Sequence, residues 1–160
     1  MKYFDYYSSP LGTMLIIEEN NALTHLTLSD NTQVLSNFPA DSLQQKSSSV
    51  ISSAKIQLNE YFKGTRKIFQ LPLNPIGTPF QKKVWNVLCT IPFGETRSYK
   101  EIALQIENPK GCRAVGMANN RNPIMLIIPC HRVIGTDGSL IGYAGGIEIK
   151  KWLLEHERTN

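Results

Sequence analysis

The chain has 160 residues, of which 41% are hydrophobic and 19% charged, enough to bury the core of one domain or two small ones. No apolar run approaches the roughly 20 residues that a membrane-spanning helix needs, and the first residues lack the features of a signal peptide. We therefore expect a cytoplasmic protein without a membrane partner. The odd number of cysteines, three, argues against a disulfide framework, and their spacing matches no common zinc pattern.

The net charge of +4 is distributed unevenly. Residues 1–75 carry 6 Lys or Arg and 6 Asp or Glu, whereas residues 76–160 carry 11 and 7. A basic half favours a polyanionic partner such as DNA, although a surplus of four charges on a solvated surface is equally compatible with chance.

The first part of the chain carries strand signals. A turn signal at residues 10–12 precedes a largely apolar run at residues 13–18, and residues 23–28 partly alternate between apolar and polar side chains. The first pattern is typical of a strand and the second of a half-buried strand. We therefore predict strands at both places.

A helix and a linker follow these strands. The polar segment 44–49 is expected to be exposed and to lead into a helix over residues 50–62, where the apolar side chains share one face and Gly64 provides a stop. A short strand is predicted at residues 68–71. Residues 72–77 contain two prolines and a glycine, which indicate a linker.

The second part of the chain carries two helix-start signals. Residues 78–81 combine a capping Thr, a Pro at the first helical position and a Gln at the third. Residues 98–101 form another capping box, with Ser at the cap and Glu at the third position. We therefore predict a helix after each of these segments.

Further helices complete the second part. A turn at residues 108–111 separates the helix that starts after Ser98 from another at residues 112–120, and two short helices joined in this way are typical of a helix-turn-helix, although many helical domains contain such a pair. A last helix is predicted at residues 147–157. Four side chains are expected to share its buried side: Ile149, Trp152, Leu153 and His156.

Reactive side chains follow an apolar run that ends at Pro129. Cys130, His131 and Arg132 come directly after it, and residues 142–146 form a Gly-rich loop where backbone can approach a ligand closely. A thiol attacks as its thiolate, and a nearby base or cation raises the thiolate fraction. The segment therefore has the groups that a nucleophilic cysteine needs.

Two interpretations of Cys130 stay open on these residues alone. Free cysteine is usually a buried structural residue, here at the end of a strand. Neighbours in an extended chain also point to opposite sides, so His131 reaches Cys130 only through a water or a backbone bend. In a Cys-His-acid arrangement a carboxylate on the last helix would then anchor the imidazole.

Residues 129–133, Pro-Cys-His-Arg-Val, resemble the signature of the O6-alkylguanine-DNA alkyltransferases, or methylated-DNA–protein-cysteine methyltransferases. The resemblance covers essentially all of residues 77–157, whereas residues 1–76 resemble the family's variable N-terminal domain only loosely. The other matching segments are Gly77-Thr78-Pro79-Phe80-Gln81 with Trp85, Pro92-Phe93-Gly94-Glu95-Thr96 with Ser98-Tyr99, Arg113-Ala114-Val115-Gly116, Asn119-Asn120-Arg121-Asn122-Pro123, Gly142-Tyr143-Ala144-Gly145-Gly146 and Trp152-Leu153-Leu154-Glu155-His156-Glu157.

The resemblance implies an α+β fold in two parts. Residues 1–76 are expected to form an N-terminal α/β subdomain with a small, mainly antiparallel sheet. Residues 77–160 are expected to form a mainly helical domain that binds DNA through a winged helix-turn-helix-like motif and accepts the alkyl group. No cofactor and no metal are implied, because the zinc ligands of some relatives are missing from this chain.

The implied activity is direct reversal of DNA damage. A flipped-out O6-alkylguanine, reached from the minor groove of double-stranded DNA, would transfer its alkyl group to Cys130. The thioether formed has no good leaving group, so each molecule, acting as a monomer, would react once. Whether O4-alkylthymine is also repaired is left open by the sequence.

The resemblance also assigns roles to single residues. Cys130 matches the nucleophile, His131 the histidine that deprotonates it through a bound water, and Glu157 the carboxylate that orients this histidine. Asn122 matches the asparagine that braces the active-site turn.

The remaining matched positions contact DNA or the base. Tyr99 matches the tyrosine that hydrogen-bonds the flipped guanine and helps to rotate the phosphate, and Arg113 matches the arginine that fills the gap in the base stack. Val133 and Ala144 match positions whose backbone groups read the guanine.

Two other functions remain as alternatives. A protein that binds alkylated DNA without repairing it would carry Cys130 as a structural thiol. A small helix-turn-helix regulator would prefer a particular DNA sequence.

Overall fold

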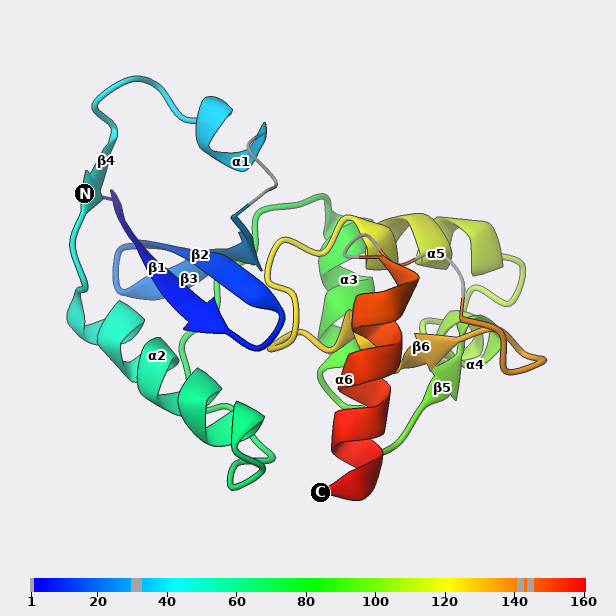
Figure 1. Ribbon diagram of the computed structural model, residues 1–160. Helices are drawn as coiled ribbons and strands as arrows, with labels where there is room; N and C mark the ends of the chain where they lie inside the picture. The colour runs from blue at the N-terminus through cyan, green and yellow to red at the C-terminus, as the bar shows by residue number, and fades with distance from the viewer. Residues whose placement is uncertain (1, 30–32, 141–142, 144–145) are drawn as a thin grey trace. The chain divides into compact units, whose positions relative to one another are not determined.

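The computed structural model describes residues 2–29, 33–140, 143 and 146–160 of the chain (Figure 1). It contains two compact units, Met1–Pro75 and Ile76–Asn160. The division falls one residue before the linker boundary expected at residues 76 and 77. None of the described helices is long and apolar enough to cross a membrane.

The first unit is a four-stranded sheet with a helix packed against it. The strand order is β3-β2-β1-β4, with antiparallel pairing except between β1 and β4, which are parallel. Its elements are β1 (Lys2–Ser9), β2 (Gly12–Glu19), β3 (Ala22–Leu28), α1 (Gln33–Ser36), β4 (Leu43–Gln45) and α2 (Ser49–Phe62).

Apolar side chains of β2 and α2 form the core of this unit. Ile16 and Ile17 on β2 and Leu58 and Tyr61 on α2 have no exposed surface. Asn20 and Asn21, both with positive φ, turn the chain between β2 and β3, as this residue type tolerates. The predicted strands 13–18 and 23–28 and the predicted helix 50–62 are confirmed.

One local prediction for this unit is incomplete and one is wrong. The segment 44–49 is largely exposed and leads into α2 as predicted, but its first two residues also belong to β4 and pair with β1. Residues 68–71 form no strand. The side chain of Gln57 instead bonds both backbone groups of Gln70, at 2.8 and 3.1 Å, so a local side-chain amide replaces a strand partner.

The second unit is mainly helical. A two-stranded parallel pair joins β5 to β6, and α4 and α5 pack together as the predicted helix pair. Its elements are α3 (Pro79–Leu88), β5 (Arg97–Ser98), α4 (Tyr99–Gln105), α5 (Cys112–Asn120), the 3-10 helix η1 (Cys130–Arg132), β6 (Val133–Ile134) and α6 (Ile147–Thr159).

Both predicted capping boxes form. The Thr78 hydroxyl accepts from the backbone N–H of Gln81, and the backbone N–H of Thr78 donates to the Gln81 side chain in return. Ser98 and Glu101 form the same pair of bonds at α4. The indole N–H of Trp85 donates to the carbonyl of Ala118 at 2.8 Å, which ties α3 to α5.

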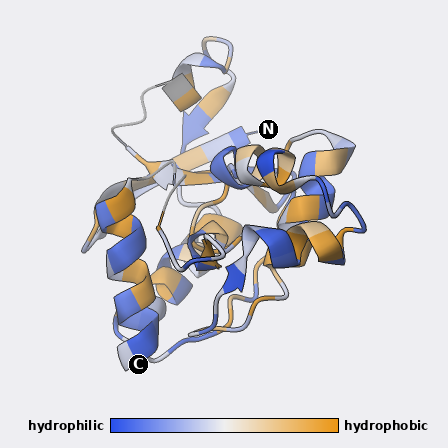
Figure 2. Ribbon diagram, turned by 90° about the vertical axis from the view of Figure 1, so that its right-hand side faces the viewer, coloured by the Kyte–Doolittle hydropathy of each residue, from blue (hydrophilic) through white to orange (hydrophobic). Residues whose placement is uncertain are grey.

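The last helix is confirmed, but of the four side chains predicted to share its buried side only Leu153 is fully buried. Hydrophilic and hydrophobic residues alternate along α6, the helix that ends at the C-terminus in Figure 2. Lys150, Leu153 and Glu157 are buried, whereas Trp152 is 37% exposed and stacks on the ring of His156. The spacing i, i+3, i+7 is helical as expected, but two of the three buried side chains are charged, a pattern that apolar periodicity does not detect.

Candidate active site around Cys130

A braced turn leads the chain to Cys130. The apolar residues 124–128 are buried, and the Asn122 side chain spans them by accepting from the Ile124 N–H at 3.0 Å and donating to the Ile128 carbonyl at 2.8 Å. The same amide acts to lower the pKa of the Cys130 thiol. Asn122 therefore braces the turn that leads to Cys130.

The backbone bends at Cys130 itself. Residues Cys130–Arg132 form a 3-10 turn, in which the N–H of Arg132 donates to the Pro129 carbonyl at 3.0 Å. The sequence predicts that His131 reaches Cys130 only through a water or a backbone bend, and this turn is such a bend. The side chains of all three residues in the turn are buried, and Cys130 is only 5% exposed.

The imidazole of His131 is oriented by a carboxylate. Its Nε2 lies 2.7 Å from Oε2 of Glu157, and His131 is 0% exposed. An ionised carboxylate only accepts hydrogen bonds, so Nε2 carries the proton and Nδ1 of the neutral ring is the basic atom. Within the described residues, Nδ1 makes no hydrogen bond to protein, so it is available to take a proton.

The same carboxylate binds Arg132. The guanidinium donates to Oε1 of Glu157 from Nε at 2.8 Å and to Oε2 from Nη2 at 3.0 Å, and its Nη1 donates to the Ile91 carbonyl at 2.7 Å. Burial acts to raise the pKa of Glu157, but the hydrogen bonds from His131 and from Arg132 hold it well below its usual range. Arg132 thus supports the carboxylate.

Burial dominates the electrostatics of the reacting pair. It raises the pKa of the Cys130 thiol, and the side chains of Asn122 and Tyr143 and the charge of Lys150 oppose this effect. Burial also lowers the pKa of His131, although Glu157 acts in the other direction. The resting pair is therefore a neutral thiol beside a neutral imidazole.

A second group of side chains gathers around Lys150. Lys150 on α6 is 0% exposed, and its Nζ donates to the Val133 carbonyl at 2.5 Å. The ammonium also lies 5.8 Å from the ring centroids of both Tyr99 and Tyr143. Lys150 and Tyr143 were not singled out from the sequence, and the Gly-rich segment that contains Tyr143 was the only signal for either.

The structure places the remaining predicted residues in different settings. Tyr99 begins α4, half-buried, and its pKa is raised by burial and by the charge of Cys130. Val133 is buried on β6. Arg113 is exposed near the start of α5 and does not belong to the buried cluster of His131, Arg132 and Glu157. Ala144 lies outside the described residues.

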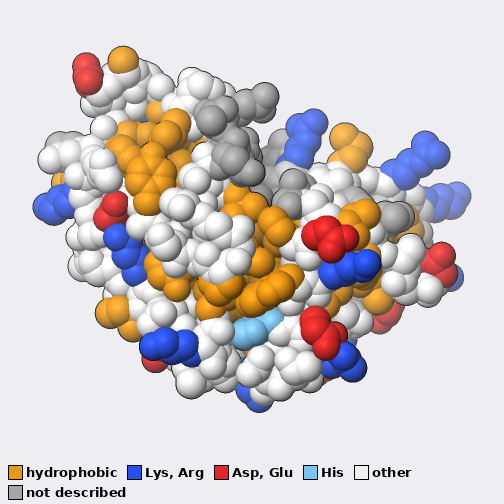
Figure 3. Space-filling view, in the orientation of Figure 1, with side chains coloured by type: hydrophobic (Ala, Val, Ile, Leu, Met, Phe, Trp, Pro, Cys, Tyr) orange, Lys and Arg blue, Asp and Glu red, His pale blue; other side chains and the backbone are white. Residues whose placement is uncertain are grey.

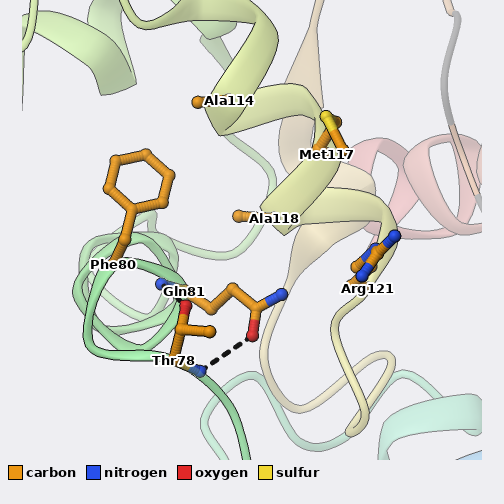
Figure 4. Close-up of a pocket in the computed structure, with 7 residues that line it drawn as sticks. All are labelled: Thr78, Phe80, Gln81, Ala114, Met117, Ala118 and Arg121. Atoms are coloured by element: carbon orange, nitrogen blue, oxygen red, sulfur yellow. Dashed lines mark hydrogen bonds between the residues drawn. The ribbon is translucent and has the colours of Figure 1, made fainter.

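A separate pocket of about 190 Å³ lies between α3 and α5 (Figure 4). Phe80, Met117 and Arg121 line it together with Thr78 and Gln81, whose capping hydrogen bond is drawn in Figure 4. None of the proposed acceptor residues lines it. In the part of the chain that the structure describes, no group of three or more His, Cys, Asp or Glu residues is arranged to hold a metal ion.

Two family models match this chain, one in each unit. The model described as "6-O-methylguanine DNA methyltransferase, DNA binding domain" matches residues 79–159. The model described as "6-O-methylguanine DNA methyltransferase, ribonuclease-like domain" matches residues 2–75. Together they span nearly the whole chain.

Curated proteins and solved structures agree with these matches. The methylated-DNA–protein-cysteine methyltransferase of Methanosarcina barkeri is 49% identical over 99% of this chain and 98% of its own length. The constitutive enzyme of the same name from Bacillus subtilis is 47% identical over 100% and 98%. The crystal structure of Mycobacterium tuberculosis OGT in complex with DNA is 43% identical, with a TM-score of 0.89 over 98% of this chain and 93% of that one.

Proposed function

This chain belongs to the 6-O-methylguanine DNA methyltransferase family, and from that membership we propose that it repairs alkylated DNA by transferring the alkyl group of O6-alkylguanine to Cys130. One observation in this chain supports the choice of Cys130. Its thiol is followed in a 3-10 turn by a buried imidazole whose Nε2 is held by Glu157 and whose Nδ1 has its lone pair available.

The proposed reaction is a single displacement. A lone pair of Sγ attacks the alkyl carbon, the bond from that carbon to O6 breaks, and its electron pair stays with the purine. The thiol proton passes to His131 and then to the departing guanine, so that intact guanine and S-alkylcysteine are the only products. A thioether offers no leaving group to water, so the protein acts once.

His131 serves as the base in this scheme. The Cys130 pKa is raised by burial, so the thiol holds its proton until a base removes it. His131 takes the proton at Nδ1 by way of a water, as the family resemblance implies, and Glu157 stabilises the imidazolium that forms. The Arg132 pair keeps Glu157 ionised throughout.

Double-stranded DNA is the proposed partner, bound in its minor groove through α5. Lys110, Arg113 and Arg121 are exposed along this helix and its flanking turns, and Figure 3 shows Lys and Arg side chains projecting from this edge of the molecule. Arg113 would fill the gap left by the flipped guanine, and Tyr99 would contact the base and its phosphate. The minor groove offers a degenerate pattern, which suits a protein that scans any sequence for damage.

The proposed site of action is the cytoplasm. The described cysteines, Cys89, Cys112 and Cys130, are all free thiols, and free thiols persist in reducing compartments.

The backbone groups of Val133, and of Ala144 outside the described residues, complete the proposed guanine pocket.

A cysteine-substitution pair tests the proposal. We expect Cys130→Ser to bind a duplex with O6-methylguanine and leave the lesion intact, while Cys89→Ser, at an exposed cysteine, repairs it as the unchanged protein does. Lesion content is measured by chromatography of the digested duplex. Repair by Cys130→Ser would refute Cys130 as the acceptor. Binding without repair by the unchanged, reduced protein would instead indicate a lesion-binding protein.

A further inference from the structure

A buried cation on α6 is not accounted for by the scheme above. Lysine is rarely buried so completely, and Lys150 has no exposed surface. Its position also departs from the apolar pattern of α6, where an aliphatic residue would pack with Leu153 at lower cost in desolvation. A charge kept in such a place calls for a function.

The surroundings of Lys150 all belong to the proposed acceptor site. Its Nζ donates to the Val133 carbonyl at 2.5 Å, directly after the 3-10 turn that carries Cys130. The ammonium lies 5.8 Å from the ring centroids of Tyr99, at the start of α4, and of Tyr143. One side chain on α6 therefore contacts β6, the start of α4 and Tyr143.

The other cation next to Cys130 is engaged elsewhere. From the sequence, Arg132 was the candidate to stabilise a thiolate, but its guanidinium forms a bidentate pair with Glu157 and bonds the Ile91 carbonyl. Burial lowers the pKa of Lys150 and raises that of Cys130, and each charge opposes the effect of burial on the other group: a negative sulfur raises the pKa of Lys150, and a positive Lys150 lowers that of Cys130.

We propose that Lys150 is a positioning residue of the alkyl-transfer site, which supplies the positive charge against which the Cys130 thiolate forms and fixes the Val133 carbonyl through its hydrogen bond. The proposal rests on the function proposed above. Charge and position act at different steps: the charge makes the sulfur easier to ionise, whereas the hydrogen bond holds the backbone group that is expected to read the guanine.

The charge of Lys150 also affects His131, which lies next to Cys130 on η1. Lys150 also disfavours a proton on His131, since like charges repel in a buried setting. The titratable groups that face the ammonium are thus Cys130 and His131 on η1, Tyr99 on α4 and Tyr143. Both effects keep the imidazole neutral and the sulfur ready to ionise.

Thiol reactivity measures this effect without DNA. We would follow the alkylation of Cys130 by iodoacetamide from pH 5 to 10 in a Cys89→Ser/Cys112→Ser background, so that only one thiol reacts. Lys150→Met removes charge and hydrogen bond, Lys150→Gln keeps a donor without the charge, and Lys150→Arg keeps a charge. Lys151→Met, exposed on the next position of α6, removes the same charge at a distance and is the matched control.

The expected result separates charge from position. Lys150→Met and Lys150→Gln should move the midpoint of the alkylation profile upward by about one pH unit, which corresponds to about tenfold slower alkylation at neutral pH. Lys150→Arg should restore most of the rate, and Lys151→Met should match the parent. Methyl transfer should fall in the same order, with Lys150→Met slower than Lys150→Gln because only the latter keeps a donor for the Val133 carbonyl.

Two outcomes would overturn the assignment. A profile for Lys150→Gln that superimposes on the parent would remove the charge effect, and this variant decides the matter even if Lys150→Met does not fold. An equal shift in Lys151→Met would show a general charge effect. Failure of the proposed function looks different, because the unchanged protein would then take up no methyl group while its thiol profile could still be measured.

Discussion

The two units of the chain bury different kinds of side chain. Among the described residues, the first unit buries two polar or charged side chains, Glu18 and Thr24, within an otherwise apolar core. The second buries six, and they are Ser98, Asn119, His131, Arg132, Lys150 and Glu157.

The comparison shows where stability was given up for chemistry. A buried apolar side chain stabilises by its removal from water, whereas a buried charge costs free energy unless its partners are in place. Glu157 meets that condition by binding both His131 and Arg132. The second unit therefore adds a few specific contacts between buried charges to its apolar core, whereas the first relies on its apolar core.

The largest expected effect comes from breaking that buried cluster. Glu157→Gln leaves the Arg132 guanidinium buried without its countercharge, so we expect a loss of about 3–5 kcal/mol in the free energy of unfolding. Glu155→Gln on the same helix breaks only the exposed pair with Arg158 and should cost about 0–1 kcal/mol. Urea denaturation measures both, and equal losses would remove the distinction between the two sites.

A smaller loss is expected in the core of the first unit. Leu58 is fully buried on α2, so Leu58→Ala should cost about 2–5 kcal/mol from lost burial and the cavity left behind. The rate of methyl transfer, corrected for the folded fraction in the same sample, should stay unchanged. A large fall in that corrected rate would show that the first unit takes part in the chemistry.

The pH dependence of methyl transfer tests whether His131 acts as a neutral base. Burial lowers the pKa of His131, so the base stays neutral through the ordinary histidine range near 6.5, and the transfer rate should fall only below it. Because folding lowers this pKa, His131 stabilises the fold above about pH 6.5 and loses that contribution as the pH falls toward the folded value. Single-turnover rates at several pH values measure this, and a decline that begins above pH 6.5 would contradict it.

The smallest effect is expected at a surface pair of the first unit. Lys55 lies 2.7 Å from Asp5 and holds the pKa of that carboxyl well below its usual range, with help from Ser47. Lys55→Met should cost at most about 1 kcal/mol at neutral pH, because the pair is partly solvated. The difference should shrink as acid protonates Asp5, which urea titrations at pH 7 and pH 2 compare. A cost that grows in acid would be the contrary result.

Sequence reasoning succeeded where the signal was local. The capping boxes at Thr78 and Ser98 each name the donor and acceptor that start a helix, and both formed as predicted. The helix of residues 50–62 followed from its apolar period and from Gly64, which adopts the positive φ expected at such a stop. The α+β fold class inferred from the family resemblance is confirmed by the match to solved structures.

The failures lie where distant residues decide. Nothing near residues 68–71 reveals that Gln57 bonds the backbone there, so a strand was predicted in error. The apolar period of α6 pointed to Trp152, whereas the buried positions are filled by Lys150 and Glu157, whose partners lie on η1 and β6. Charged residues at core positions can be found only once those partners are known.

The candidate site divides in the same way. Cys130, His131 and Glu157 were identified from the resemblance, and the structure brings the last two within 2.7 Å. The role of Arg132 was predicted wrongly. Its position next to Cys130 in the sequence suggested that its charge stabilises the thiolate, whereas its guanidinium binds the carboxylate of Glu157. The role of Arg113 stays a prediction.

Intact-protein mass spectrometry tests the central claim most directly. The protein is mixed with a duplex that contains one O6-methylguanine, and the product is digested to locate the modification. We predict a gain of one methyl group per protein, saturating at one equivalent and confined to the Cys130 peptide, with Cys89 and Cys112 unmodified. An unchanged mass in folded, reduced protein, or a methyl group on either exposed cysteine, would contradict the account.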